Sequence, residues 1–345
     1  MQVTKNKESG RGLSDQLETE KAIERVKMTF SHLLSGKLGL HKVVAPLAVS
    51  ENSGINDELN NVERPVSFPI KNIHGKTGVI VQSLAKWKRL RLAQLALEPG
   101  AGILTDMKAL RPDEKPGPMH SIFVDQWDWE QVIDSSNYNI EYLQETVVKI
   151  YEAMLLTEQI IRSQYPFIAP VLPPEITFIH AEDLLRAYPG LSPAEREHKV
   201  AEKYKAVFLI GIGNKLSNGE AHDGRAPDYD DWTTETHKGY YGLNGDIIVW
   251  NPLLKCAFEL SSMGIRVNEK ALLKQLSIRN CMEKAGLFYH RMLLESKLPQ
   301  TIGGGIGQSR LCMLLLGKKH IGEVQASIWP EDYYGEGCGD EVRIV

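Results

Sequence analysis

Apolar residues spaced three and four positions apart predict two long amphipathic helices in this chain. The first covers residues 17–38 and ends at Gly36 and Gly39, which suit a helix C-terminus. The second covers residues 139–163, and Pro166 stops it. The apolar stripe of the first helix contains Ile23, Val26, Phe30, Leu33 and Leu34. Shorter helices are predicted at residues 181–186, 192–204, 268–275 and 280–294.

Apolar and β-branched runs predict strands between these helices. Residues 40–49 form a predicted strand that Pro46 interrupts, and the missing backbone donor of a proline places such a strand at an edge or interface. Other strands are predicted at residues 79–84, 122–127, 173–180, 207–212, 246–250 and 257–266. No repeat or Pro/Ser-rich linker divides the chain. We therefore expect one α/β domain over residues 17–345, with a mixed sheet built from strands that are not neighbours in sequence.

The composition favours a soluble protein without a nucleic-acid coat function. The 345 residues carry 40 Lys and Arg against 44 Asp and Glu, a formal charge of −4. No apolar stretch is long enough for a membrane span, and residues 1–16 are polar with both signs of charge, which predicts a disordered extension rather than a signal peptide. The four cysteines are far apart, which indicates free thiols in a reducing compartment. We expect a cytoplasmic protein.

The segment at residues 301–311 contains four glycines within five positions, at 303, 304, 305 and 307. Arg310 follows, and an apolar run begins directly after it. This pattern predicts a strand that turns into a helix, with a permanent cation beside a bare backbone, as a nucleotide site requires. The segment matches neither a Walker loop nor a dinucleotide fingerprint. The alternative is a glycine-rich turn that only packs a helix on a sheet.

A second group of candidates occupies residues 107–114 and 120–130, which predict two antiparallel strands joined by a loop. Arg111 ends the first strand. In the second strand polar and aromatic residues alternate, so that two sets face opposite sides. The polar set is Gln126, Asp128 and Glu130, and the aromatic set is Trp127 and Trp129. Either the polar set lines a pocket, or the strand is half-exposed with a solvated face.

A third group follows in residues 246–266. Asp246 precedes a strand on which Glu259, Ser261 and Met263 are expected to share one face. Two carboxylates near several arginines would hold a polyphosphate and its magnesium, because hard oxygen ligands bind the metal and guanidinium groups bind phosphates. The carboxylates are Asp246 and Glu259, and the arginines are Arg111, Arg266 and Arg310.

Taken in order, residues 39–47, the Arg111 hairpin, and residues 246–266 with the glycine-rich segment resemble the three motifs of class II aminoacyl-tRNA synthetases. The chain resembles the aspartate–ammonia ligase family (asparagine synthetase A) still more closely, from about Leu17 to Pro330. The strings that carry this resemblance are residues 83–89, 107–114, 124–130, 225–232, 242–246 and 258–266. One departure is Gln82, where the family often has histidine.

The resemblance implies a class II synthetase-like fold, with a mainly antiparallel sheet flanked by helices, and the conversion of L-aspartate, ATP and ammonia into L-asparagine, AMP and diphosphate through a β-aspartyl-adenylate. It also implies a homodimer formed through the Pro46 strand. The implied ATP-binding residues are Arg111, Asp246, Glu259, Ser261, Arg266, Gly305, Gly307 and Arg310, with Asp246 and Glu259 as magnesium ligands. The implied aspartate-binding residues are Asp57, Ser83, Lys88, Gln126, Asp128, Asp230 and Ser262. The implied catalytic residues are Arg111, Gln126, Asp57 and Lys88.

Without the resemblance, several of these residues have ordinary explanations. Lys88 lies in a basic run with Lys86 and Arg89, and most such runs are solvated faces. Asp57 lies in a polar loop, and the acidic cluster at residues 228–231 is typical of an exposed turn or a cation site.

Three other functions compete with an ammonia-dependent ligase. An aspartyl- or asparaginyl-tRNA synthetase needs an anticodon-binding module, for which no residues remain. A non-catalytic paralogue that senses amino acid or nucleotide is expected to lose the motif arginines or the acidic pair, and all are present here. A glutamine-dependent asparagine synthetase needs an N-terminal cysteine nucleophile, but residue 2 is Gln2 and the first cysteine is Cys256.

Overall fold

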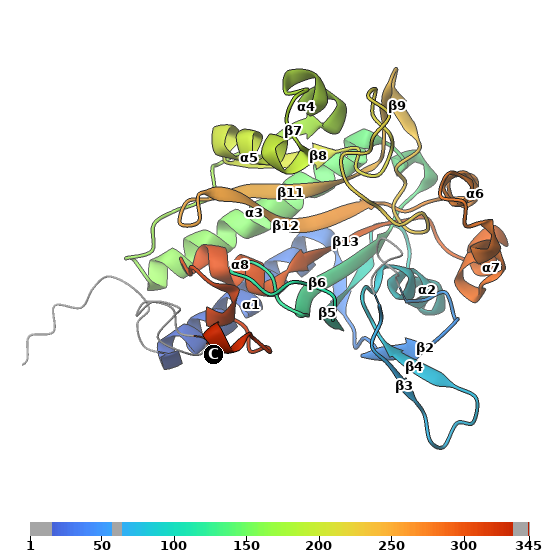
Figure 1. The fold of residues 1–345 in the computed structure, drawn as a ribbon, viewed down its shortest axis with the longest axis horizontal. Helices are drawn as coiled ribbons and strands as arrows, with labels where there is room; N and C mark the ends of the chain where they lie inside the picture. The colour runs from blue at the N-terminus through green and yellow to red at the C-terminus, as the bar shows by residue number, and fades with distance from the viewer. Residues whose placement is uncertain (1–15, 57–63, 334–343, 345) are drawn as a thin grey trace, which may run out of the picture.

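The computed structural model describes residues 16–56, 64–333 and 344, and its centre is an eight-stranded sheet (Figure 1). The strand order is β1-β5-β6-β13-β12-β11-β8-β7. The two outermost pairs, β1–β5 and β7–β8, are parallel, and every other pair in this sheet is antiparallel. The bounds are β1 Leu40–Lys42, β5 Gly102–Leu110, β6 Phe123–Val132, β13 Thr301–Gly307, β12 Cys256–Ile265, β11 Asn244–Asn251, β8 Ala206–Ile210 and β7 Thr177–His180. This architecture confirms the expected mixed, mainly antiparallel sheet.

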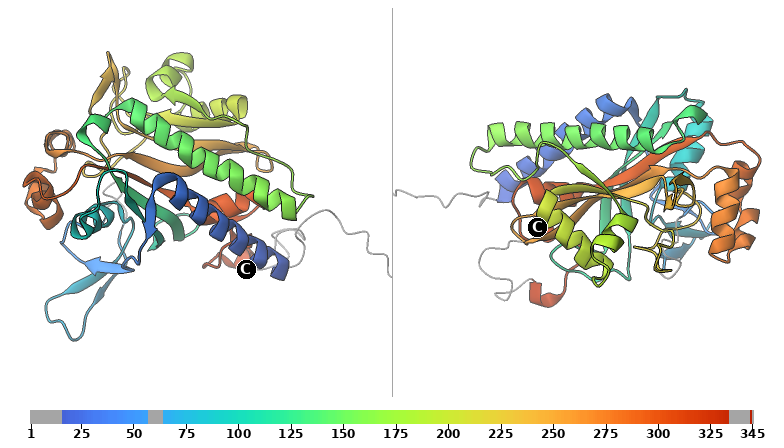
Figure 2. Two further views of the ribbon diagram at one scale, coloured as in Figure 1. Left: turned by 180° about the vertical axis from the view of Figure 1, so that it is seen from behind. Right: turned by 90° about the horizontal axis from the view of Figure 1, so that it is seen from above.

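One face of the sheet is apolar and is covered by two long helices, α1 (Gln16–Leu38) and α3 (Ile140–Gln164), which run side by side across it (Figure 2). Both were predicted from their apolar spacing. Trp127 and Trp129 are fully buried against this layer, and the ring of Phe30 in α1 packs at a tilt on Trp127 with centroids 4.6 Å apart. Burial of such large side chains is the dominant stabilising contribution to a core of this kind.

Shorter helices cover the two ends of the opposite face. At one end, α4 (Ala181–Ala187) and α5 (Pro193–Tyr204) pack on β8 and β11. Towards the other end lie α2 (Ala85–Leu95), α6 (Glu269–Ile278) and α7 (Phe288–Leu294) (Figure 1). Helix α8 (Gln308–Leu315) continues from β13, as the glycine-rich segment predicted. The middle strands are left with polar side chains on this face.

The remaining elements are short. A three-stranded sheet contains β2 (Ala48–Ser50), β4 (Thr77–Ile80) and β3 (Ser67–Pro69), and a hairpin contains β9 (Glu235–His237) and β10 (Tyr240–Tyr241). Turns of 3-10 helix occur at Ser135–Asn137, Met282–Gly286, Ile321–Glu323 and Glu331–Tyr333. No helix in the described part of the chain is both long and apolar enough to span a membrane.

Some local predictions are confirmed and others are wrong. Ser192 forms the predicted capped start of α5 by accepting a hydrogen bond from the Glu195 amide. The predicted helix at residues 280–294 is divided into a 3-10 turn and α7, and helix α2 was not predicted. Residues 40–49 form the separate strands β1 and β2, with β1 at the sheet edge. Residues 1–15, expected to be disordered, lie outside the described residues.

Candidate active site

The register of the sheet aligns polar residues of four strands on the face opposite α1 and α3. Asp246 of β11 pairs with Ser262 of β12, Ser262 with Gly305 of β13, and Gly305 with Asp128 of β6. Because directly paired residues project to the same side of a sheet, these positions form one row. The glycines of β13 are required here, because a Cβ at Gly305 would collide with the Gln126 amide and one at Gly303 with the Glu130 carboxylate.

Lys88 of α2 lies directly above this row and is fully buried. Its ammonium forms an ion pair with Asp128, lies 3.6 Å from Glu130, and donates to the carbonyls of Trp129 at 2.8 Å and Gly304 at 3.1 Å. Its three N–H groups therefore already have acceptors. The explanation of Lys88 as part of a solvated basic face is wrong.

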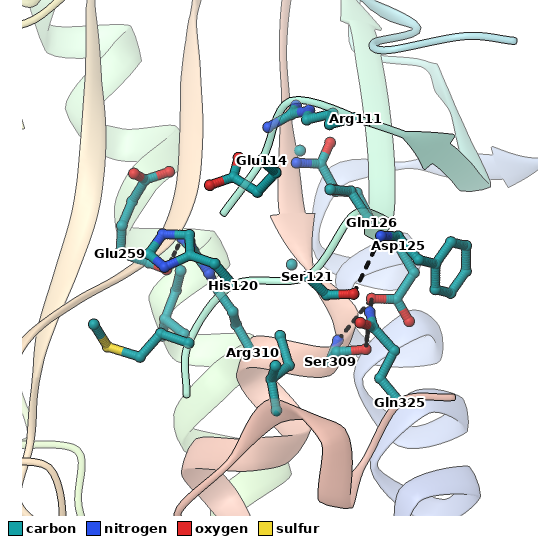
Figure 3. Close-up of a pocket in the computed structure, with 17 residues that line it drawn as sticks. Arg111, Glu114, His120, Ser121, Asp125, Gln126, Glu259, Ser309, Arg310 and Gln325 are labelled. Carbon is teal, nitrogen blue, oxygen red and sulfur yellow. Dashed lines mark hydrogen bonds between the residues drawn. The ribbon is translucent and has the colours of Figure 1, made fainter. Parts of the chain in front are cut away.

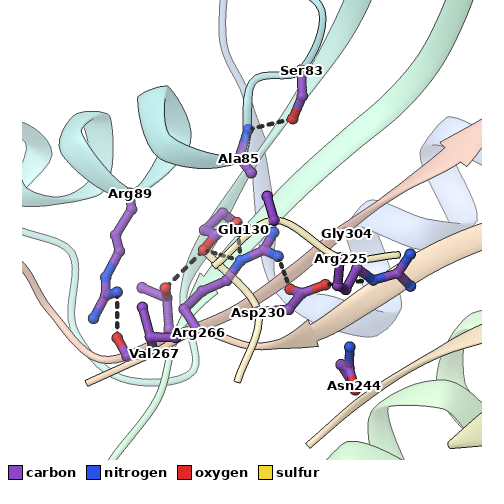
Figure 4. A network of polar contacts seen from close by, with 12 residues as sticks. Ser83, Ala85, Arg89, Glu130, Arg225, Asp230, Asn244, Arg266, Val267 and Gly304 are labelled. Atoms are coloured by element: carbon purple, nitrogen blue, oxygen red, sulfur yellow. Dashed lines mark hydrogen bonds and ion pairs between the residues drawn. The ribbon is translucent and has the colours of Figure 1, made fainter. Parts of the chain in front are cut away.

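Arg266 extends these ion pairs along the site (Figure 4). Its guanidinium binds Glu130 through Nε at 2.9 Å and a terminal nitrogen at 2.8 Å, and it also binds Asp230. Arg225 adds two more ion pairs to this series: its Nε lies 3.5 Å from an oxygen of Asp230, and a terminal nitrogen pairs with Asp246. We call these seven residues the buried charge network. They are Asp246, Arg225, Asp230, Arg266, Glu130, Lys88 and Asp128.

Burial and pairing oppose each other within the buried charge network. Burial alone would raise the pKa of Glu130, but Arg266 and Lys88 hold it below its ordinary value. At Asp128 burial outweighs Lys88, and the pKa of its carboxyl is raised. The pKa of Arg266 is raised by its two acidic partners despite burial. The network thus keeps Arg266 occupied, which leaves two of the three predicted triphosphate ligands outside it.

Those two, Arg111 and Arg310, line the same cavity of about 250 Å³ (Figure 3). We call it the open pocket. Gln126, Glu259, Gly305 and Gly307 line it as well, so six sequence-predicted residues meet here. Glu114 and His120, from the loop between β5 and β6, also line it but were not singled out from the sequence. Burial and the neighbouring Arg310 lower the pKa of His120, which favours its neutral form.

The two arginines of the open pocket have few protein partners. A terminal nitrogen of Arg111 lies 3.3 Å from the Gln82 carbonyl, and its buried Nε has no acceptor among the described residues. Arg310 donates to the Glu259 carbonyl at 3.0 Å, and its guanidinium lies over the Phe258 ring, 5.8 Å from the centroid. Most of their donors are therefore available to an anionic ligand.

Asp125 fixes the helix that carries Arg310. Its carboxylate accepts from the Ser309 amide at 3.0 Å and the Ser309 hydroxyl at 2.7 Å, at the first turn of α8. Gln325 and Lys27 donate to it as well, at 3.3 Å and 2.9 Å. A carboxylate at a helix N-terminus is favourable because it satisfies free amides. No separate sequence signal indicated Asp125, which lies one position before Gln126.

Asp246 and Glu259 lie on the same face of the sheet, but Ser261 does not. β12 has a bulge at Leu260, so that Glu259 pairs with Ile248 while Ser261 pairs with Ile247, which belongs to the apolar layer under α3. The prediction that Glu259, Ser261 and Met263 share one face is therefore wrong. The Ser261 hydroxyl is buried and has no hydrogen-bond partner in the described part of the chain.

The acidic pair fits a magnesium ion that is shared with phosphates. Burial, with a contribution from Glu259, raises the pKa of Asp246 to about 7 although Arg225 opposes it. Glu259 is exposed, and its carboxylate has no ion pair among the described residues. Those residues contain no group of three or more potential metal ligands. Two carboxylates are nevertheless enough for Mg²⁺, which takes its other ligands from water and substrate phosphates.

Three further predicted residues remain to be located. Ser83 precedes α2, and its hydroxyl accepts from the Ala85 amide at 3.2 Å (Figure 4). Ser262 is half-buried beside Gly305 in the polar row. Asp57 lies outside the described residues. Arg225 was not singled out from the sequence, although it is the first residue of the acidic string at residues 225–232. A cation at such a position is the signal that could have identified it.

Comparison with solved structures defines the class of fold. The asparaginyl-tRNA synthetase of Pyrococcus horikoshii, solved with asparaginyl-adenylate, aligns with a TM-score of 0.67 and 14% identity, over 91% of this chain and 70% of that one. The enzyme of Entamoeba histolytica, solved with the same adenylate, aligns with a TM-score of 0.64 and 14% identity, over 90% and 66%. The chain therefore has the fold of a class II aminoacyl-tRNA synthetase.

Sequence comparison is more specific. The family model described as aspartate–ammonia ligase matches residues 17–340, ten residues beyond the Pro330 limit of the resemblance. Aspartate–ammonia ligase of Parabacteroides distasonis is 55% identical over 95% of both chains, and that of Bacteroides thetaiotaomicron is 53% identical over 96% of both. That of Clostridium perfringens strain SM101 is 54% identical over 91% of both. This chain belongs to the aspartate–ammonia ligase family.

Proposed function

We propose that this chain makes L-asparagine from L-aspartate, ATP and ammonia, with release of AMP and diphosphate through a β-aspartyl-adenylate. The observation that carries the proposal is the open pocket, in which Arg111 and Arg310 share a cavity that borders the polar row of the sheet. Family membership supports the same reaction. The pocket would take ATP, and the neighbouring buried charge network would take aspartate.

The charge balance of the network suits an amino acid. Its four carboxylates exceed its three cations by one negative charge, which favours the ammonium group of a substrate near Asp128 and Asp230. Ser83, Ser262 and Gln126 would add hydrogen bonds, and Asp57 is a further candidate. Because the donors of Lys88 are already used, Lys88 would act mainly by holding Asp128 in place.

The proposed reaction joins the aspartate held by the buried charge network to the ATP held in the open pocket. An oxygen of the aspartate side-chain carboxylate attacks the α-phosphorus of ATP, the bond to the bridging oxygen breaks, and diphosphate leaves. Arg111 would offset the negative charge that develops on the α-phosphate, and Gln126 would orient the reacting carboxyl. Ammonia then attacks the acyl carbon, AMP leaves, and a base accepts the surplus proton. Asp57 is the candidate base that the family resemblance supplies.

Other residues of the site would bind the adenine base, the outer phosphates and magnesium. Arg310 would bind the outer phosphates and the base, over the bare backbone at Gly305 and Gly307. Asp246 and Glu259 would hold magnesium, which neutralises phosphate charge when it is bound. Arg266 and Ser261 were expected at this end, but their positions support an indirect role for Arg266 and none for the Ser261 side chain.

A homodimer in the cytoplasm is part of this proposal. Val44 and Leu47, on either side of Pro46, are 93% and 59% exposed, and Met28 of α1 is 65% exposed. Large exposed apolar side chains are common at interfaces, and a second copy of the chain is the proposed partner. Sedimentation at micromolar concentration is expected to give a dimer, and a pure monomer would exclude it.

One assay tests the function. AMP release is expected to require aspartate, ATP, magnesium and an ammonium salt together. Arg111→Ala should lower its kcat/KM by about a thousandfold, whereas Arg291→Ala, a change at an exposed arginine of α7, should leave it unchanged. Binding of ATP and aspartate without AMP release would instead support a sensor. Charging of tRNA with the same amino acid would support a tRNA synthetase.

A further inference from the structure

The segment at residues 225–232 carries Asp230 of the candidate aspartate site and has no regular secondary structure except one bridge. That bridge joins Asp230 to Arg266 at the end of β12. The Asp231 amide donates to the Ile265 carbonyl at 2.9 Å, and the Val267 amide donates to the Tyr229 carbonyl at 2.8 Å. These bonds attach one side of the segment to the sheet and leave the carbonyl of Asp230 directed away from it.

The side chain of Gln275 binds three backbone groups on the other side of the segment. Gln275 of α6 is fully buried. Its amide nitrogen donates to the carbonyls of Pro227 and Asp230, both at 2.9 Å. Its amide oxygen accepts from the Trp232 amide at 2.8 Å. Three backbone groups on both sides of Asp228 and Asp230 thus converge on one amide.

We propose that Gln275 is a positioning residue for the amino-acid end of the site: by fixing the backbone of Asp230, it aims that carboxylate between Arg225 and Arg266. The proposal rests on the function proposed above. Gln275 contacts no reacting atom, and the open pocket does not include it. Its effect should therefore appear in aspartate binding and not in ATP binding.

The amide chemistry explains why glutamine suits this position. An amide supplies two donors and an acceptor at one end of a short chain, which matches two carbonyls and one N–H group. A glutamate would keep the acceptor but would bring a carboxylate against two carbonyls. A methionine would fill the volume and leave all three backbone groups unpaired, a costly result in a buried site. Sub-ångström displacement of a substrate-binding carboxylate is enough to weaken binding.

The chain contains a matched control in Gln131 of β6. This glutamine is also buried, and its amide donates to the carbonyls of Leu38 at 2.8 Å and Gly100 at 3.0 Å and accepts from the Tyr142 hydroxyl at 3.0 Å. It makes the same kinds of bond as Gln275, but it ties α1 to the sheet instead of holding the segment at residues 225–232. Substitution of either residue should reduce thermal stability to a similar extent.

The experiment compares Gln275→Glu, Gln275→Met and Gln131→Glu with the wild type. Calorimetry with aspartate alone and steady-state AMP release are measured at pH 8 and pH 6. Both Gln275 variants are expected to raise the Kd and KM for aspartate at pH 8 by about ten- to a hundredfold, with the KM for ATP within about twofold. Gln275→Glu should recover part of its affinity at pH 6, because burial raises the pKa of the new carboxyl and its protonated form can donate. Gln275→Met should not recover, and Gln131→Glu should keep the wild-type KM for aspartate.

Several results would overturn the proposal. Equal shifts in the KM for both substrates, or an aspartate KM that changes as much in Gln131→Glu, would reduce Gln275 to a structural role. Wild-type aspartate affinity in both folded Gln275 variants would do the same and leave the proposed function standing. Failure of the wild type to bind aspartate would overturn both. Thermal unfolding and sedimentation of each variant establish that the comparison is made on folded, equally assembled protein.

Discussion

The buried charge network and the open pocket lie side by side, but their cationic residues differ in the protein partners they have. In the network, Lys88, Arg266 and Arg225 all have carboxylate partners and are at least nine-tenths buried as side chains. In the open pocket, Arg111 and Arg310 bind only carbonyl groups of the described residues. The cations of the first region are therefore paired by the protein itself, whereas the arginines of the second have donors left for a ligand.

This difference predicts how substitutions in each region change the stability and the activity of the protein. Removing one partner from a buried ion pair leaves an uncompensated charge and costs stability. Removing an arginine whose donors face a cavity leaves the fold almost intact, because nothing else depended on it. Substitutions in the network should thus affect folding and activity together, and substitutions in the pocket should affect activity alone.

The largest effect is expected from Lys88→Met. Asp128 and Glu130 would lose their shared cation in a fully buried position, and we expect a loss of about 3–5 kcal/mol in the free energy of unfolding together with loss of activity. Urea unfolding measures the first. Lys108→Met, at an exposed lysine of β5, is the control and should change stability by no more than about 0.5 kcal/mol. Equal stability of the two variants would contradict the interpretation of the network.

Arg111→Ala is expected to lower kcat/KM by about a thousandfold, which is typical for loss of one group that stabilises transition-state charge. Its melting temperature should stay close to that of the wild type, because the side chain makes a single long hydrogen bond. Arg111→Lys should restore part of the rate. A melting temperature that falls as far as that of Lys88→Met would show that the open pocket and the buried charge network do not differ in this respect.

Glycine substitutions test the same contrast with a single methyl group. At Gly303 the added carbon would overlap the Glu130 carboxylate and press on Arg266, so Gly303→Ala should cost about 1–3 kcal/mol. At Gly307, in the open pocket, the nearest atom is the Arg310 Cβ at 3.3 Å, and Gly307→Ala should cost clearly less. Thermal unfolding of the pair is the measurement, and the reverse order would be a contradiction.

The smallest effect concerns pH and Asp228, which accepts from Lys86 at 2.9 Å and lies 3.0 Å from His290 Nε2. Burial would raise the pKa of Asp228, but Lys86 and His290 hold it below its ordinary value. The pKa is lower in the folded than in the unfolded chain, so this contribution is present above about pH 4 and is lost as pH falls further. Asp228→Asn should be less stable by about 1.5 kcal/mol at pH 7, and the gap should narrow as pH falls below about 4. A constant gap would exclude the linkage.

Much of the fold could be predicted from spacing, but the buried cations could not. Alternation separated Trp127 and Trp129 from Gln126, Asp128 and Glu130 because a strand has a period of two. Helix α2 was missed because its buried positions include lysine and arginine, which normally mark a solvated face. Only their partners on distant strands make this burial possible.

Two predictions at the site were wrong because they depend on contacts with strands far away in the sequence. The bulge at Leu260 resets the alternation of β12, and nothing in the local sequence reveals that one residue is extra there. Arg266 has the residue type of a phosphate ligand, but Glu130, far away in the sequence, occupies it. Residue type indicated which groups belong to the site, and strand register decided what each group can reach.

Because four acids and three bases cannot cancel, the network is electrically neutral only when it holds one more positive charge. Burial that outweighs Lys88 raises the pKa of Asp128, and burial raises that of Asp246 to about 7, so a proton binds the network more readily as pH falls. An amino acid that brings its own ammonium group would expel that proton. Uptake of the substrate then becomes an exchange of cations, and its calorimetric heat should vary with the ionisation enthalpy of the buffer.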